Sequence, residues 1–418
     1  RQSGKQKNGG NMIDINYERF FSANAQPMKE SEIQELLKYS NKPGIISFAG
    51  GYPAPDLFPI TEITQIISEL MAKEGKNILQ YGATEGYLPL REELLKFMKK
   101  QGVDLTLGNL LIITSSQQGL DLVGKLLLNP GDIVMTEYPT YIGAIMAFNC
   151  YAAKMISTEI EDDGIAAAKL ETAIKSLIAR NQKPKFIYVI PDFQNPSGIT
   201  ISLGKRKELI RIAETYDLLL VEDSPYRQLR FEGETEPPLI SLNLERVISI
   251  FTFSKILFPG FRLGWMIGPE RLMKKIAILK QAGDICAPPF NQAITAEFMK
   301  KELLDIQIGK IISTYRKKRD LMLEKLAEYM PKIPGLKWTQ PHGGLFLWLN
   351  LPENMDAVAM FKKAIEKKVA YVVGQAFDPE GIRRNTMRLN FSFPTLAEID
   401  EGIKRLAEVI GSRYSANE

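Results

Sequence analysis

Five stretches of the sequence each place a polar or aromatic side chain directly after an apolar run. Lys255 closes "FTFSK" in surroundings where a charged amine is rarely left without a partner or a task. Asp223 follows "LLLVE", Asn195 lies in the turn "PDFQNPSG", and Tyr141 ends "YPTY". The small polar run 115–118, "SSQQ", opens a helical pattern. Together they offer an amine nucleophile, a carboxylate, an amide, an aromatic face and an anion-binding helix start.

The apolar runs before these residues predict neighbouring strands of one sheet. They lie at 110–114, 132–137, 185–190, 218–222 and 247–251, with a sixth at 264–268, and helical patterns such as 203–216 separate them. Continuous apolar strands that alternate with helices are typical of a mostly parallel α/β sheet flanked by helices. Ligands of such sheets bind beyond the carboxyl ends of the strands. The sequence therefore predicts that the five stretches meet in one site.

The chemistry of this set matches a single cofactor, a phosphorylated pyridine aldehyde. Such a cofactor needs a lysine that bonds to its aldehyde and a carboxylate that keeps its ring nitrogen protonated. It also needs a phosphate cradle, an aromatic ring that stacks on the pyridine, and donors for its phenolate oxygen. The ordered set of residues predicts pyridoxal 5'-phosphate.

Composition excludes several other classes. The chain has 418 residues, 53 basic against 49 acidic, and a formal charge of +4, which gives no argument for nucleic acid. No apolar run is long enough to span a membrane. Two cysteines, Cys150 and Cys286, imply no disulfide framework, so a cytoplasmic location is expected. The single histidine, His342, excludes any metal site with two histidine ligands, and no metal is expected.

The length predicts more than one domain. We expect a disordered tail (1–15), an N-terminal arm that forms part of a small domain (16–60), a large cofactor-binding domain (61–310) and a C-terminal small α/β domain (311–418). The C-terminal domain would contain strands at 344–351, 369–373 and 387–393 and helices at 355–368 and 396–411. A capped helix is expected at 31–39, and one long helix around 292–330 would connect the domains.

Several motifs carry a family resemblance. Asp223 of "EDSPY" follows Asn195 of "NPSG" by 28 residues, Lys255 of "FSK" follows Asp223 by 32, and "PGFRLGW" comes next. The order resembles the fold-type I pyridoxal-phosphate aminotransferases. "ISFAGGYPAPDLFP", "LQYGATEGYLPLR", "SSQQGLDLV" and "PHGGLFLWL" resemble their aminoadipate, kynurenine and multisubstrate branch, from about residue 16 onward.

The resemblance implies a role for each matching residue. Lys255 would bond to the cofactor and move the proton between the substrate Cα and cofactor C4′, and Asp223 would pair with the pyridinium nitrogen. Asn195 and Tyr226 would hydrogen-bond the ring O3′, and Tyr141 would stack on the ring. Lys255, Asp223 and Tyr141 are thus the expected catalytic residues.

The remaining roles concern the phosphate and the substrate. Ser116, Gln117, Ser254 and Arg262 would hold the phosphate, and Tyr81 would reach the phosphate of a neighbouring subunit. Arg388 of "MRLNFS" would clamp the substrate α-carboxylate, and Gly51, Asn195 and Gln34 would lie on the substrate side.

Each residue also has a structural interpretation. Lys255 could extend from a core strand to water, Asp223 and Asn195 could be cap or turn residues, and Tyr141 and Tyr81 could be core. The two arginines, Arg262 and Arg388, could form surface ion pairs. His342 precedes a glycine pair at a strand entry, which favours a structural role over a substrate lid.

One departure concerns the substrate. Many members of the branch have an arginine where "SEIQELL" has Gln34, and a neutral amide pairs a distal carboxylate more weakly than a guanidinium does. Aromatic and aliphatic side chains therefore remain open beside aminoadipate.

The predicted function is transfer of an amino group from an L-amino acid to a 2-oxo acid such as 2-oxoglutarate, within amino-acid metabolism. The family implies a homodimer with each site completed across the interface. The alternatives are a lyase or decarboxylase on the same fold, or a non-catalytic regulator domain. A regulator would need a DNA-binding module ahead of the motifs, where about a dozen loose residues are expected.

Overall fold

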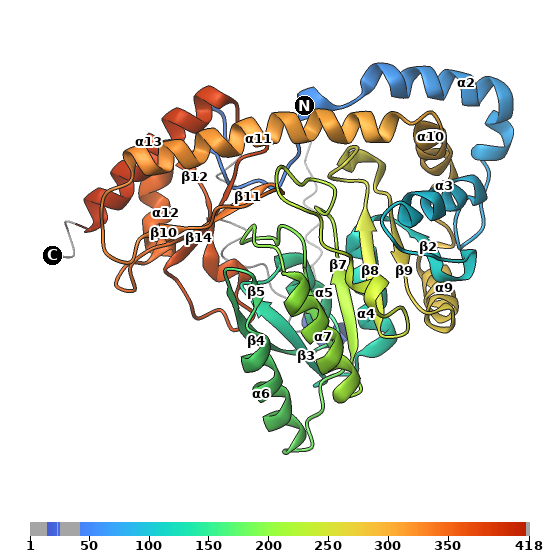
Figure 1. Ribbon diagram of the computed structural model, residues 1–418, viewed down its shortest axis with the longest axis horizontal. Helices are drawn as coiled ribbons and strands as arrows, with labels where there is room; N and C mark the ends of the chain where they lie inside the picture. Colours follow the sequence, from blue (N-terminus) through green and yellow to red (C-terminus); the bar gives the residue numbers. More distant parts are fainter. Residues whose placement is uncertain (1–14, 23, 26–41, 415–418) are drawn as a thin grey trace, which may run out of the picture.

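An eight-stranded sheet forms the centre of the molecule (Figure 1). The computed structural model describes residues 15–22, 24–25 and 42–414. In spatial order the strands are β2 (Leu110–Ile113), β9 (Gly264–Ile267), β8 (Val247–Thr252), β7 (Leu219–Asp223), β6 (Phe186–Val189), β3 (Ile133–Tyr138), β4 (Lys154–Glu161) and β5 (Gly164–Ile165). Only β9 and β5 run antiparallel to their neighbours. The predicted mostly parallel sheet is confirmed.

Helices cover both faces of this sheet because its central strands are apolar throughout. Strands β2, β6 and β8 are buried along their whole length. In Figure 1, α7 (Leu203–Thr215) lies in front of the sheet and α4 (Ser115–Leu127) behind it. The other helices are α2 (Ile60–Ile78), α3 (Leu88–Lys99), α5 (Ile142–Asn149), α6 (Ala167–Ile178), α8 (Leu239–Leu242), α9 (Glu270–Asp284), α10 (Pro289–Lys300), α11 (Leu303–Tyr329), α12 (Ala357–Glu366) and α13 (Leu396–Tyr414).

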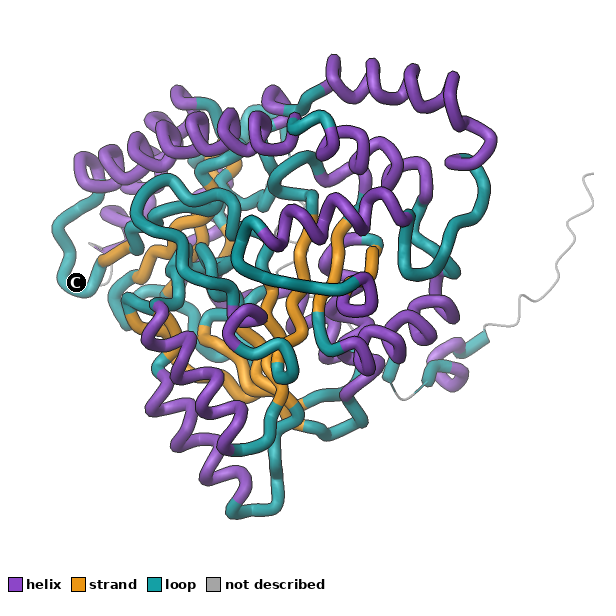
Figure 2. The backbone as a smooth tube through the Cα atoms, turned by 45° about the vertical axis from the view of Figure 1, so that its right-hand side comes forward, coloured by secondary structure: helices purple, strands orange, loops and turns teal. Residues whose placement is uncertain are grey.

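A smaller α/β lobe lies beside the large sheet, and Figure 2 shows its strands apart from those of the large sheet. Its antiparallel sheet has the order β10 (Lys337–Trp338), β11 (Phe346–Asn350), β14 (Thr386–Asn390) and β13 (Val372–Val373). A separate parallel pair joins β1 (Ile46–Ser47) to β12 (Val369–Ala370), so an N-terminal segment packs with the C-terminal lobe.

Two predicted elements are wrong as single units. The run 369–373 divides at Tyr371 into β12 and β13, which belong to different sheets. The buried Tyr371 hydroxyl donates to the Ala357 carbonyl oxygen at 2.6 Å and holds this bend against α12. The expected helix at 292–330 is two helices, because Glu302 takes a left-handed conformation (φ 58°) between α10 and α11.

Helix α11 links the two parts of the molecule and packs along α13 (Figure 1). The domain limits near 60 and 310 stay a prediction. The expected helix at 31–39, with Gln34, and residues 1–14 of the expected tail lie outside the described residues. None of the described helices is long and apolar enough to cross a membrane.

Candidate active site

A cavity of about 490 Å³ lies where the carboxyl ends of the parallel strands meet the small lobe. The loops after β2, β3, β6, β7 and β8 all contribute to it, as expected for this sheet. The predicted site residues that line it are Gly51, Ser116, Gln117, Tyr141, Asn195, Asp223, Tyr226, Ser254, Lys255, Arg262 and Arg388. Of the predicted residues that the structure describes, only Tyr81 lies outside the cavity.

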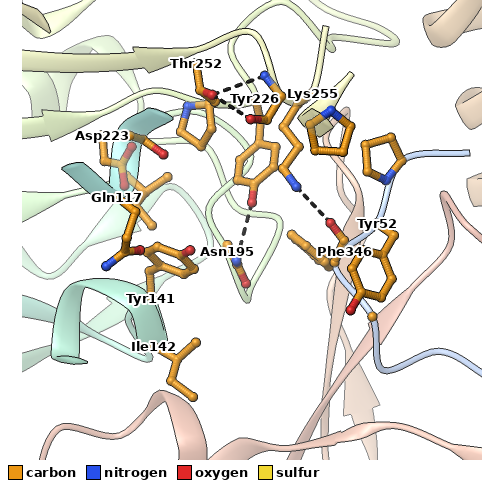
Figure 3. A pocket seen from close by; sticks show the side chains of 18 of the residues that line it. Tyr52, Gln117, Tyr141, Ile142, Asn195, Asp223, Tyr226, Thr252, Lys255 and Phe346 are labelled. Atoms are coloured by element: carbon orange, nitrogen blue, oxygen red, sulfur yellow. Dashed lines mark hydrogen bonds between the residues drawn. The ribbon is translucent and has the colours of Figure 1, made fainter. Parts of the chain in front are cut away.

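The amine of Lys255 points into this cavity (Figure 3). Its Nζ donates to the carbonyl oxygen of Gly51 at 2.8 Å. Burial, reinforced by the positive charges of Arg388 and Arg262, lowers the pKa of Lys255 to about 8. About a tenth of this amine is therefore neutral and nucleophilic at pH 7, far more than for a lysine of ordinary pKa.

Asp223 ends β7 as a buried carboxylate at the cavity wall. Its Oδ2 accepts a hydrogen bond from the Tyr188 hydroxyl at 2.9 Å, whereas its buried Oδ1 has no partner. Burial raises the pKa of Asp223 to about 7; the Tyr188 hydrogen bond opposes this rise and Glu222 adds to it. An unpartnered buried carboxylate oxygen at a cavity wall is costly unless a donor from a ligand meets it.

Arg388 links the small lobe to the end of β6. Its Nη1 donates to Asn195 Oδ1 at 2.9 Å, and its Nη2 donates to the Ala49 carbonyl oxygen at 2.6 Å. Asn195 Nδ2 in turn donates to the Tyr226 hydroxyl at 3.3 Å (Figure 3). Burial lowers the pKa of Arg388 to about 10, and its guanidinium lies 4.2 Å from the centre of the Phe346 ring.

The start of α4 and the loop after β8 form an anion cradle. No side chain caps the first turn of α4, so its free backbone amides are available to a ligand. Arg262 takes a left-handed conformation (φ 48°) and donates through Nη2 to the Ser115 hydroxyl. Thr252 Oγ1 accepts from the Ser254 amide at 3.1 Å and donates to the Ser254 hydroxyl at 2.9 Å. A phosphate fits this set of amides, hydroxyls and one guanidinium.

Sequence reasoning missed several residues of the site. Ser115 begins the predicted run 115–118 but was not singled out in it, and Thr252 lies two residues before Ser254, so both could have been found from their position. Phe346 and Tyr52 come from other parts of the chain and carry no local signal. Tyr188 lies inside an apolar strand, where its hydroxyl has no sequence signature.

Tyr81, a predicted site residue, and His342, for which a structural role was favoured, both lie away from the cavity. Tyr81 is 78% exposed in the single chain, so the role expected for it in a neighbouring subunit stays a prediction. His342 Nδ1 lies 2.9 Å from Glu232 Oε1 and does not line the cavity, which fits the structural interpretation.

The residues present fit pyridoxal phosphate, because the free Oδ1 of Asp223 suits a pyridinium nitrogen and the amine of Lys255 suits an aldehyde. This fold with this site defines a fold-type I pyridoxal-phosphate-dependent enzyme. The chain belongs to the class I and II aminotransferases, whose family model matches residues 45–406.

Individual relatives agree with this assignment. The chain is 44% identical to aromatic-amino-acid aminotransferase 1 of Thermococcus litoralis, over 95% of each protein. A solved kynurenine aminotransferase of Pyrococcus horikoshii is 45% identical, with a TM-score of 0.92 over 95% of this chain and 98% of that one. The α-aminoadipate aminotransferase LysN of Thermus thermophilus, solved with N-(5'-phosphopyridoxyl)-L-leucine, is 34% identical, with a TM-score of 0.87 over 96% and 100%. The predictions of fold, cofactor and amino-group transfer are thereby confirmed.

Proposed function

We propose that this aminotransferase prefers L-amino acids with large aromatic side chains as donors and uses a 2-oxo acid such as 2-oxoglutarate as acceptor. The observation that carries the proposal is the apolar wall of the cavity, by which we mean the lining residues Tyr52, Ile142, Phe346, Val372 and Phe377. The relatives named for aromatic amino acids and kynurenine support the same preference.

The cations of the cavity support this preference further. Among the described residues that line it, the basic side chains are Lys255, Arg262 and Arg388. Arg262 belongs to the anion cradle and Arg388 would bind the substrate α-carboxylate. Neither arginine is therefore available to pair with a second carboxylate at the far end of a substrate. An aromatic side chain instead gains burial against the apolar wall.

Pyridoxal phosphate, when bound, supplies an aldehyde that exchanges with the donor amine and a pyridinium ring that withdraws electrons from the substrate Cα. Asp223 would hold the ring nitrogen in its protonated form through the free Oδ1. Tyr141 would cover one face of the ring, and Asn195 with Tyr226 would bind its O3′. Ser116, Gln117, Ser254 and Arg262 would hold the phosphate.

Lys255 would first bond to the cofactor and then, once released, take the proton from the substrate Cα and return it at C4′. Its lowered pKa suits this base role at neutral pH. Arg388 would turn its guanidinium to the substrate α-carboxylate, and Asn195, already bonded to Arg388, would hold it in place. Gly51 would border the substrate, because its carbonyl oxygen contacts the resting lysine.

We also propose that the enzyme is a cytoplasmic homodimer. Tyr81, exposed in the single chain, would complete the phosphate site of the partner subunit. The two cysteines of the sequence are both free thiols, which fits a reducing compartment.

The test is the absorbance spectrum of the protein loaded with pyridoxal phosphate. Phenylalanine, tyrosine, kynurenine, leucine and 2-aminoadipate would each be added alone, and 2-oxoglutarate afterwards. We expect aromatic donors to convert the spectrum fastest and 2-oxoglutarate to reverse it. Faster conversion by 2-aminoadipate would overturn the aromatic preference, and release of carbon dioxide or ammonia would indicate a lyase.

Two variants control this experiment. Lys255→Ala should abolish the conversion, with a loss of at least about 10³-fold in rate. Lys274→Ala removes an exposed lysine that pairs with Glu270 on the outside of α9, and it should change nothing.

A further inference from the structure

Tyr188 is a buried polar group that the proposed mechanism does not use. Its side chain is fully buried, and its ring meets that of Phe148 edge-on, with the ring centres 5.6 Å apart. The hydroxyl donates to Asp223 Oδ2 at 2.9 Å. A phenol in the core of a parallel sheet needs such a partner, because burial of an unpaired hydroxyl is unfavourable.

The register of the sheet produces this contact. Tyr188 on β6 pairs with Val221 on β7, and Asp223 follows Val221 by two residues. Side chains two residues apart on a strand point to the same face, so Tyr188 and Asp223 are neighbours on that face. The contact is therefore fixed by two adjacent strands and not by a mobile loop.

The two oxygens of Asp223 consequently differ. Oδ2 is held by Tyr188, and Oδ1 has no hydrogen-bond partner. We propose that Tyr188 is a positioning residue, which fixes the carboxylate plane of Asp223 so that Oδ1 faces the ring nitrogen of the cofactor as an anion. This inference rests on the proposed role of Asp223.

Charge supports the same role. Burial disfavours the carboxylate form of Asp223, and the Tyr188 hydroxyl is its one hydrogen-bond donor among the described residues. Glu222, next to Asp223, instead accepts the amides of Leu239 and Ile240 and the hydroxyl of Ser249. Glu137 on β3 accepts from the Ile190 amide and from Gln194. Glu222 and Glu137 thus have hydrogen-bond donors of their own, and the Tyr188 hydroxyl donates to Asp223.

The test compares two ligands that differ only at the ring nitrogen. One is pyridoxamine 5'-phosphate, which cannot bond covalently to Lys255, and the other is its analogue with CH in place of that nitrogen. Their dissociation constants are measured by calorimetry on the apo-protein at one fixed pH, so the other titrating groups affect both ligands alike. The ratio of the two constants reports the contact with Asp223.

Tyr188→Phe removes one oxygen and keeps the ring. We expect the affinity for pyridoxamine phosphate to fall about tenfold, and that for the CH analogue to change less than about twofold. Tyr371→Phe, which removes another buried tyrosine hydroxyl hydrogen-bonded at 2.6 Å, should leave the ratio unchanged. Equal weakening of both ligands by Tyr188→Phe would show a merely structural role and overturn the inference.

Two further variants complete the experiment. Asp223→Asn should remove the preference for pyridoxamine phosphate over the CH analogue. If the preference remains, the role proposed for Asp223 is wrong. If Asp223→Asn removes the preference but Tyr188→Phe leaves it unchanged, only the role proposed for Tyr188 is refuted. Site-specific 3-fluorotyrosine at 188 keeps the shape and the hydroxyl, so it remains informative if Tyr188→Phe does not fold. This variant should keep the ratio of the two dissociation constants that the unmodified protein shows. A ratio that falls to the value of Asp223→Asn would contradict the inference.

Discussion

The guanidinium of Arg388 and the side-chain amide of Asn195 are hydrogen-bonded at 2.9 Å although 193 residues separate them in the chain. Arg388 belongs to β14 of the small lobe, and Asn195 follows β6 of the large sheet. The group proposed for the substrate carboxylate and the group proposed for the cofactor O3′ therefore share one contact. A small change at Arg388 is expected to affect substrate binding first, because this residue lines the cavity and its buried Nε has no hydrogen-bond partner among the described residues.

Arg388→Lys is the first prediction. A lysine keeps the charge and loses the two-pronged donor geometry, so the KM for the amino donor should rise about 10- to 100-fold, with a smaller change in kcat. Steady-state kinetics measure this split. Arg384→Lys is the matched control, because Arg384 is an exposed arginine that pairs with Asp356 at 2.7 Å. An equal KM for both variants would contradict the clamp.

The second prediction concerns the amine of Lys255, whose pKa is about 8 instead of the ordinary 10.5. Only the neutral amine attacks an aldehyde, so capture of pyridoxal phosphate by the apo-protein should accelerate with pH and level off above about pH 8. Stopped-flow absorbance from pH 6 to 10 measures the rate. A rate that still increases tenfold between pH 9 and 10 would exclude the lowered pKa.

A third prediction follows from the pKa of about 7 that burial gives Asp223 and Glu137. In the unfolded chain these carboxyls lose their protons near pH 4, but in the folded apo-protein only near pH 7. Between these values the unfolded state binds fewer protons, so the free energy of unfolding of the apo-protein should decrease as pH rises, by a few kcal/mol.

Urea denaturation of the apo-protein at pH 4.5, 5.5, 6.5 and 7.5 measures this slope. Asp223→Asn should reduce it, since the amide does not titrate, and Glu137→Gln should reduce it separately. A slope that neither variant changes would assign the effect to other groups.

The fourth prediction tests the contribution of Tyr81 to a second subunit. Tyr81→Phe should weaken the binding of pyridoxal phosphate about 10- to 100-fold, the loss expected for one hydrogen bond to a charged group. Tyr17→Phe, at another exposed tyrosine, should have no effect. Sedimentation at the concentrations of the binding assay establishes whether the dimer is present. A monomer that binds the cofactor equally well with either residue at position 81 would refute the shared site.

The sequence predicted the site better than it predicted the elements, and the reason is physical. Asp223, Asn195 and Lys255 follow apolar strands, and parallel strands bring their carboxyl ends to one edge, so spacing alone sufficed to group them. The break at Glu302 could not be foreseen, because the helical pattern continues on both sides and a left-handed glutamate has no sequence signature.

Other features depended on contacts between distant segments. The bend at Tyr371 is held by α12, and the partner of Asp223 is a tyrosine indistinguishable from core residues of β6. The exposure of Tyr81 in the single chain could not be predicted either, because it depends on the tertiary fold and not on the residues next to Tyr81 in the sequence.

Helix α11 has a mechanical consequence. Its 27 residues form a rod of about 40 Å that serves both parts of the molecule. Near its middle Arg319 bonds to Glu232 of the large part at 2.7 Å and to the Pro341 carbonyl oxygen beside the small lobe. The same helix is bonded at two neighbouring residues, because the Tyr315 hydroxyl accepts from the Ala54 amide at 2.9 Å and Lys318 Nζ donates to the Ser392 carbonyl oxygen at 2.8 Å. A stiff rod that is bonded to both parts acts as a brace, so it resists a change in their spacing.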